Sequence, residues 1–112
     1  MRTAIFVYQT TPVQISTSET DLELCGMDAA PVPLSAGSNA QTLTLTPGIY
    51  KIVSSHGVEI TGDKAGFDVT TFTKTNDPDF TPPRAIETFT SLDATALAAF
   101  LAAPDAKELV HV

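Results

Sequence analysis

The chain has 112 residues, of which 43% are hydrophobic and 17% charged, and its formal net charge is −7. This length suits one hydrophobic core, so residues 1–112 are expected to form a single β-rich domain. Nucleic acids and anionic membranes both require a basic face, and neither is expected as a partner because the bases are scattered singly. They are Arg2, Lys51, Lys64, Lys74, Arg84 and Lys107.

Cysteine content and apolar runs bear on the cellular compartment. Cys25 is the single cysteine, so no intrachain disulfide can form. The N-terminal apolar run stops at Gln9, which makes it too short for a signal peptide. No run approaches the ~20 apolar residues that span a bilayer. The default expectation is a cytoplasmic protein, with non-classical export left open.

The apolar pattern of residues 3–9 predicts a first strand. Alternation places Ile5 and Val7 on one face and Phe6 and Tyr8 on the other. Because both faces are apolar, this strand is expected to be central and covered on both sides.

Two shorter strands and a loop are expected next. Pro12 should end the first strand, and residues 13–15 alternate again as a second one. Residues 22–25 suggest a third strand. The prolines and glycines of 26–39 predict a surface loop.

The most informative local pattern is the alternation of Leu and Thr over residues 42–46, followed by Pro47-Gly48 and a second apolar strand. An L-proline followed by glycine favours a type I or type II turn, whereas tight hairpins prefer the mirror-image turns. We therefore expect the chain to turn a corner here and pass from one sheet to another.

Residues 49–74 are predicted to form a three-stranded meander. A hairpin loop at 55–57 would place Ile52 opposite Ile60, and a loop at 63–66 would place Val69 opposite Ile60. This register gathers one apolar face. Its members are Tyr50, Ile52, Val58, Ile60, Phe67 and Val69.

The C-terminal third is expected to differ in character. Residues 75–90 are predicted to form a long Pro-containing excursion with a short strand at 85–89. An Ala-rich helix over 92–103 should pack on a sheet, and 107–112 should form a last strand. The expected fold class is mainly β, namely an antiparallel β-sandwich or partly open barrel of about seven to eight strands with one C-terminal α-helix (92–103).

Candidate catalytic residues are sparse. Cys25 with His56 and His111 supplies the residue types of a thiol nucleophile and its base. A lone cysteine after apolar residues is more often a small buried hydrophobe. His56 also fits a hairpin tip, where a left-handed backbone is tolerated.

Metal and ligand candidates are similarly limited. Asp77 and Asp79 offer oxygen atoms to Ca²⁺, but their spacing is also typical of acidic turns. A small-molecule cavity would have to form among aromatic residues, namely Tyr50, Phe72, Phe80 and Phe89. The sequence contains no phosphate-binding glycine loop, dinucleotide fingerprint or nucleophile elbow. We therefore expect neither catalytic activity nor a cofactor.

The stretch Leu45-Thr46-Pro47-Gly48-Ile49-Tyr50-Lys51-Ile52 resembles the L-x-P-G-x-Y strand corner of small β-sandwich modules in bacterial surface proteins and of small phage virion or tail-associated proteins. The chain as a whole is similar to small β-rich proteins of Ala-rich bacterial genomes. This resemblance implies a β-sandwich and transfers no functional residue.

The expected function is therefore that of a non-enzymatic binding or structural module that acts through protein–protein contacts. One alternative is a phage- or prophage-derived virion or tail-associated structural protein. A second alternative is a small-molecule- or Ca²⁺-binding β domain. The identity of any protein partner is left open.

Overall fold

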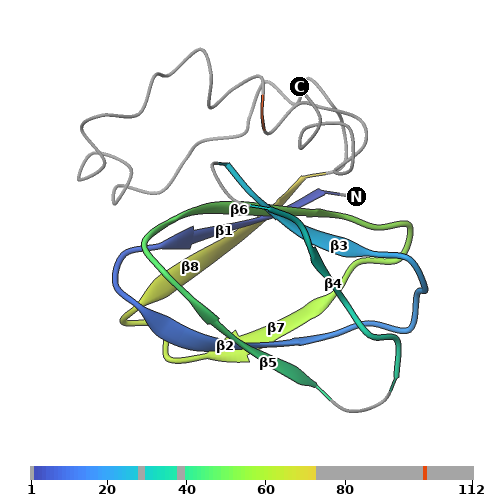
Figure 1. The fold of residues 1–112 in the computed structure, drawn as a ribbon, viewed down its shortest axis with the longest axis horizontal. Coiled ribbons are helices and arrows are strands. Elements are labelled where there is room, and N and C mark those ends of the chain that lie inside the picture. The colour runs from blue at the N-terminus through green and yellow to red at the C-terminus, as the bar shows by residue number, and fades with distance from the viewer. Residues whose placement is uncertain (1, 28–29, 38–39, 73–99, 101–112) are drawn as a thin grey trace.

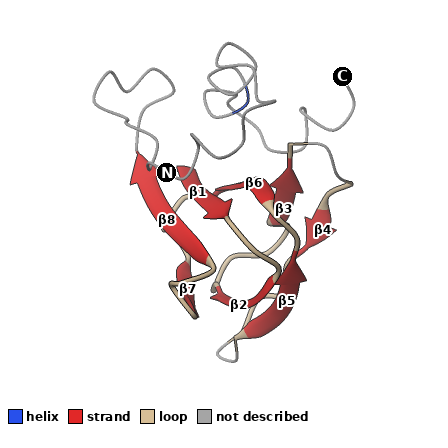
Figure 2. Ribbon diagram, turned by 90° about the vertical axis from the view of Figure 1, so that its left-hand side faces the viewer, coloured by secondary structure: helices blue, strands red, loops and turns tan. Residues whose placement is uncertain are grey.

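A computed structural model of the chain describes residues 2–27, 30–37, 40–72 and 100. The described part contains eight antiparallel strands in two sheets (Figures 1 and 2). The strands are β1 (Arg2–Val7), β2 (Thr11–Ser16), β3 (Glu23–Gly26), β4 (Val32–Pro33), β5 (Gln41–Leu45), β6 (Gly48–Val53), β7 (Glu59–Gly62) and β8 (Phe67–Phe72). The expectation of a mainly β protein is confirmed.

The two sheets face each other as separate layers. One has five strands in the order β4-β3-β6-β1-β8, and the other has three in the order β5-β2-β7. β1 lies between β6 and β8 and all six of its residues are buried, so the prediction of a central strand covered on both faces is confirmed. β2 instead alternates buried and exposed residues, because only one face of the smaller sheet meets the core.

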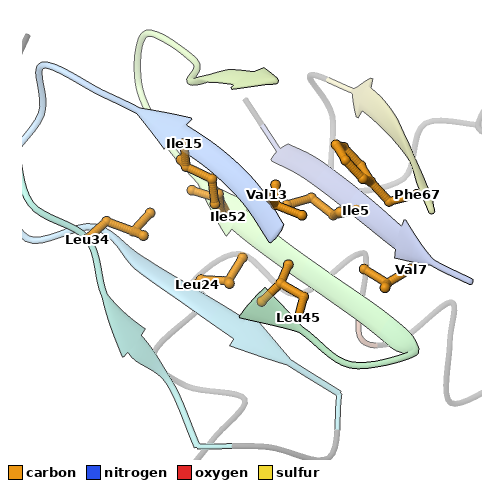
Figure 3. Packing of buried hydrophobic residues seen from close by; sticks show 9 residues of the cluster. All are labelled: Ile5, Val7, Val13, Ile15, Leu24, Leu34, Leu45, Ile52 and Phe67. Carbon is orange, nitrogen blue, oxygen red and sulfur yellow. The ribbon is translucent and has the colours of Figure 1, made fainter. Parts of the chain in front are cut away.

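The core lies between the two layers and draws side chains from both (Figure 3). Its buried members alternate along their strands, as a period of two requires. They are Ile5, Val7, Val13, Ile15, Leu24, Leu34, Leu45, Ile52 and Phe67.

A second apolar layer lies on the outer face of the five-stranded sheet. The pairing of Phe6 with Ile49 and of Ala4 with Lys51 puts these side chains on the face away from the main core, and all of them are buried. Phe100 is also buried, and its contacts with Lys51 place it on this face. The Lys51 ammonium donates a hydrogen bond to the Phe100 carbonyl and lies 5.0 Å from the centre of the Phe100 ring. The rest of the expected helix over 92–103 lies outside the described residues.

The predicted meander over 49–74 is wrong in its pairing. β6 pairs with β1 and β3, whereas β7 pairs with β2 and β8 pairs with β1. Ile52 therefore lies opposite Thr3, and Ile60 lies opposite Ile15. The loops at 54–58 and 63–66 carry the chain from one sheet to the other. They are as short as hairpin loops, so loop length alone does not distinguish the two kinds of connection.

The corner at Pro47-Gly48 is confirmed. β5 belongs to the three-stranded sheet and β6 to the five-stranded one, and two residues join them. Gly48 has a φ of 155°, which L-residues with a side chain rarely adopt. The Tyr50 hydroxyl donates a hydrogen bond to the Thr46 carbonyl, 2.7 Å away, and so closes the corner from the strand that follows it.

Two boundaries differ from those expected. β2 begins at Thr11 and includes Pro12. Pro12 pairs with Thr44 of β5, whereas the pairing of β2 with β7 begins only at Val13. The missing N–H of Pro12 therefore leaves no gap in the hydrogen bonds between β2 and β7. Residues 26–39 are not a loop throughout, because Val32–Pro33 forms β4 at the sheet edge.

The expected strands at 85–89 and 107–112 lie outside the described residues. Within the described ranges, no helical segment has the length and apolarity needed to cross a bilayer.

Candidate functional site

The connections between strands gather at the two opposite ends of the paired sheets. Residues 17–22, 34–37 and 54–58 meet at one end, on the right of Figure 1, which we call the Glu19 end. Residues 8–10, 46–47 and 63–66 meet at the other, which we call the Tyr8 end. Because a rigid sheet scaffold commonly presents its function on such loops, both ends are candidate sites.

The Glu19 carboxylate joins two loops of the Glu19 end. One of its oxygens accepts a hydrogen bond from the Ser55 backbone N–H at 2.9 Å, and the other accepts one from the His56 N–H at 3.1 Å. These bonds, from Ser55 first and then from His56, hold the pKa of Glu19 below its usual value. The loop between β6 and β7 is thus held by a charge-assisted pair of contacts.

The loop between β2 and β3 also holds the third loop of this end, residues 34–37. The Thr17 carbonyl accepts a hydrogen bond from the Gly37 N–H at 3.0 Å, and the Leu22 carbonyl accepts one from the Leu34 N–H at 2.9 Å. All three loops are therefore connected through residues 17–22. Within that segment Asp21 has a φ of 64°, a left-handed conformation that Asp tolerates better than most residues.

An open depression of about 480 Å³ lies on the Glu19 end. Its lining mixes polar and apolar area and comes from all three loops, the end of β2 and the start of β7. The lining residues are Ser16, Thr17, Ser18, Gly37, His56, Gly57, Val58 and Glu59. Such a surface offers hydroxyl, carboxylate and imidazole groups and is open to solvent, which is unlike the enclosed apolar pockets that hold cofactors.

Exposed charge also differs between the two ends. Asp21 and Glu59 are exposed at the Glu19 end. Among the described bases, Arg2 and Lys51 are buried and Lys64 is exposed at the Tyr8 end, 4.2 Å above the Phe67 ring. The Glu19 end is therefore acidic.

The Tyr8 end is closed by its own side chains. The Tyr8 hydroxyl donates a hydrogen bond to the Asp68 carboxylate, and the Gly66 carbonyl accepts bonds from the N–H groups of Tyr8 and Gln9. Burial, followed by the bond to Asp68, raises the pKa of Tyr8 well above its usual value. The polar groups of the Tyr8 end thus hold the loops at 8–10 and 63–66 together.

The structure places Cys25 and His56 in different surroundings. Cys25 is fully buried on β3, opposite Lys51 on the outer face of the five-stranded sheet. His56 is exposed in the loop between β6 and β7. A thiol without solvent access cannot meet a substrate from solution, so the buried-hydrophobe interpretation of Cys25 is the one that fits.

The remaining candidates fall mostly outside the described residues. These are His111, Asp77, Asp79, Phe80 and Phe89, as well as the side chain of Phe72. Tyr50 is half-buried against the core and bonded to the corner. In the described part of the chain, no three His, Cys, Asp or Glu side chains are grouped to hold a metal ion.

Sequence reasoning missed Glu19, the residue that organises this end. It stands in a polar stretch, Ser16 to Asp21, without any motif. Its partners are backbone N–H groups 36 and 37 residues away, and these leave no side-chain signal in the sequence. The only signal was a general one: the backbone N–H groups of a loop need acceptors, and a nearby carboxylate can supply them.

Comparison of the chain with protein-family models, with curated protein sequences and with solved structures finds no match.

Proposed function

We propose that this protein is a non-enzymatic binding module that contacts a partner protein through the Glu19 end. The observation that carries this proposal is the network in which residues 17–22 accept hydrogen bonds from backbone N–H groups of both neighbouring loops. A surface ordered before binding loses less conformational entropy when a partner arrives. The network therefore suits recognition.

The composition of the surface favours a protein partner over a small ligand. The depression is open, and most of its lining residues are small Ser, Thr and Gly. Such a lining can form many hydrogen bonds with a polypeptide but cannot enclose a small molecule. The exposed acids at this end favour a partner whose contacting groups are neutral or basic.

Site-specific photo-crosslinking tests the proposal. A benzophenone amino acid is placed at Ser18 or His56 of the full chain, and at Thr46 of the Tyr8 end as the matched control. All three positions are exposed, so the fold should tolerate each replacement. After irradiation in cells of the native host, Ser18 and His56 should yield the same discrete adduct, and Thr46 should not.

The adduct's protein is then purified and titrated against the chain. Ser18→Arg should weaken its binding by about tenfold or more, because the added cation and bulk oppose a neutral or basic partner surface. Thr46→Arg should leave the affinity unchanged. Equal adducts from both ends, or none from the Glu19 end, would overturn the proposal.

A further inference from the structure

β5 is an edge strand with an unusual lack of protection. It stands at the end of the three-stranded sheet, and β2 is its only strand partner among the described residues. Its sequence, Gln41-Thr42-Leu43-Thr44-Leu45, contains no charge, proline or glycine. Leu43 is half-buried, while Thr42 and Thr44 are exposed on the outer face.

The other edges of the two sheets carry features that discourage strand addition. β4 is two residues long and ends in Pro33. β7 is four residues long, begins with the exposed Glu59 and ends in Gly62. β8 carries Asp68, which Tyr8 holds at the sheet surface. Charges, proline and shortness are the usual means of blocking an edge, and β5 has none of them.

The β5 sequence is self-complementary in the antiparallel direction. A two-fold axis through Leu43 would place Thr42 opposite Thr44 of the second copy, on the exposed face. Gln41 would then stand opposite Leu45, and Leu43 opposite its own copy. Thr–Thr pairs across antiparallel strands are favourable, and a two-fold interface needs such a self-matching surface.

We propose that two copies of this chain associate through antiparallel pairing of their β5 edges about Leu43. The two three-stranded sheets would then join into one continuous sheet across the two-fold axis. The Gln41 side-chain oxygen accepts a hydrogen bond from the Ser35 N–H at 2.9 Å, and this bond involves the side chain of Gln41 and not its backbone. The pairing would use the edge of β5, whereas the proposed partner contact uses the loops of the Glu19 end.

The overall charge provides an independent signature of this association. Each copy carries a formal charge of −7, so two copies repel each other at long range, whereas the edge itself is uncharged. Added salt screens that repulsion over about 8–10 Å near physiological ionic strength. The dimer should therefore tighten as salt is raised.

Two double variants with the same backbone test the pairing and its register. Thr42→Lys with Thr44→Lys puts like charges opposite each other twice across the axis. Thr42→Lys with Thr44→Glu puts opposite charges there. Both replace exposed side chains, so circular dichroism should show an unchanged fold, and Thr61→Lys on β7 controls for an added surface charge.

Sedimentation velocity over a dilution series is the readout. The wild-type chain and the Thr61→Lys control should form a dimer that dissociates on dilution. The Lys/Lys variant should dissociate at about tenfold or more higher concentration, and the Lys/Glu variant should return to within about threefold of the wild type.

Several results would overturn the proposal. These are a wild-type chain that is monomeric at every concentration, a Lys/Lys dimer as tight as the wild type, or a Lys/Glu variant as weak as Lys/Lys. A monomeric chain whose β5 amides become protected from hydrogen exchange by an added Thr-Leu-Thr-Leu peptide would show that the edge accepts a foreign strand instead. None of these results would alter the crosslinking expected at the Glu19 end.

Discussion

At the scale of single residues, the two tyrosines show how one side-chain type serves two structural purposes. The Tyr50 hydroxyl donates to a backbone carbonyl four residues earlier, whereas the Tyr8 hydroxyl donates to the Asp68 carboxylate sixty residues away. The first contact is local and follows from the L-x-P-G-x-Y pattern. The second depends on β8 lying beside β1, so no local pattern announces it.

The raised pKa of Tyr8 has a consequence for stability at high pH. The folded state holds this proton more tightly than the unfolded chain, whose tyrosines titrate near pH ~10. The stabilisation is complete below about pH 10 and is lost as the pH rises from there towards the higher folded pKa.

Ultraviolet titration of the wild type and of Tyr8→Phe should reveal this effect. The difference between the two curves isolates Tyr8, and its midpoint should lie well above ~10. The free energy of unfolding should fall more steeply above pH ~10 in the wild type than in Tyr8→Phe. A difference curve with an ordinary tyrosine midpoint would show that the contact with Asp68 does not persist in solution.

At the scale of elements, alternation predicted the faces of the strands and failed to predict their neighbours. All six residues placed on one face of the expected meander belong to the core or pack against it. Yet their strands do not pair with one another. In two facing sheets, inward side chains meet across the core whether or not their strands share hydrogen bonds, so the apolar pattern cannot distinguish the two cases.

The corner between β5 and β6 should depend measurably on Tyr50. Tyr50→Phe keeps the ring against the core but removes the hydrogen bond to the Thr46 carbonyl, which lies in an exposed position. We expect the free energy of unfolding to fall by about 0.5–1 kcal/mol.

Thr46→Val is the matched control for the corner. It removes the Thr46 hydroxyl, which lies 3.2 Å from the Tyr50 hydroxyl, but leaves the carbonyl acceptor in place. Its effect on urea unfolding should be smaller than that of Tyr50→Phe. If Tyr50→Phe had no effect, the corner would rest on Pro47 and Gly48 alone.

At the scale of the whole molecule, the centre of the five-stranded sheet, at β1, is buried on both faces, and part of the second layer comes from distant sequence. Phe100 is 5% exposed and contacts Lys51, which stands on the outer face of β6. The buried ammonium interacts with both the carbonyl and the ring of this residue. Residues as far apart as 51 and 100 thus belong to one packed body.

Truncation of Phe100 should therefore destabilise the entire domain. Phe100→Ala is expected to lower the free energy of unfolding by about 3 kcal/mol, whereas Phe100→Leu should cost less than about 1.5 kcal/mol. Far-UV circular dichroism and tyrosine fluorescence should report one coincident urea transition for each variant. Two separate transitions, or no change for Phe100→Ala, would show that the outer layer is independent of the sheets.

The sequence by itself determined the β class, the central and doubly covered β1, the inward faces of β6, β7 and β8 and the sheet change at Pro47-Gly48. These features follow from side-chain periodicity and turn geometry, which act over a few residues. The tertiary structure decided which strands are neighbours, that Glu19 joins the loops of one end, and that β5 stands at the end of its sheet among the described strands. These depend on contacts between distant segments, many of them through backbone groups that every residue carries, and so they leave no trace in the order of side chains.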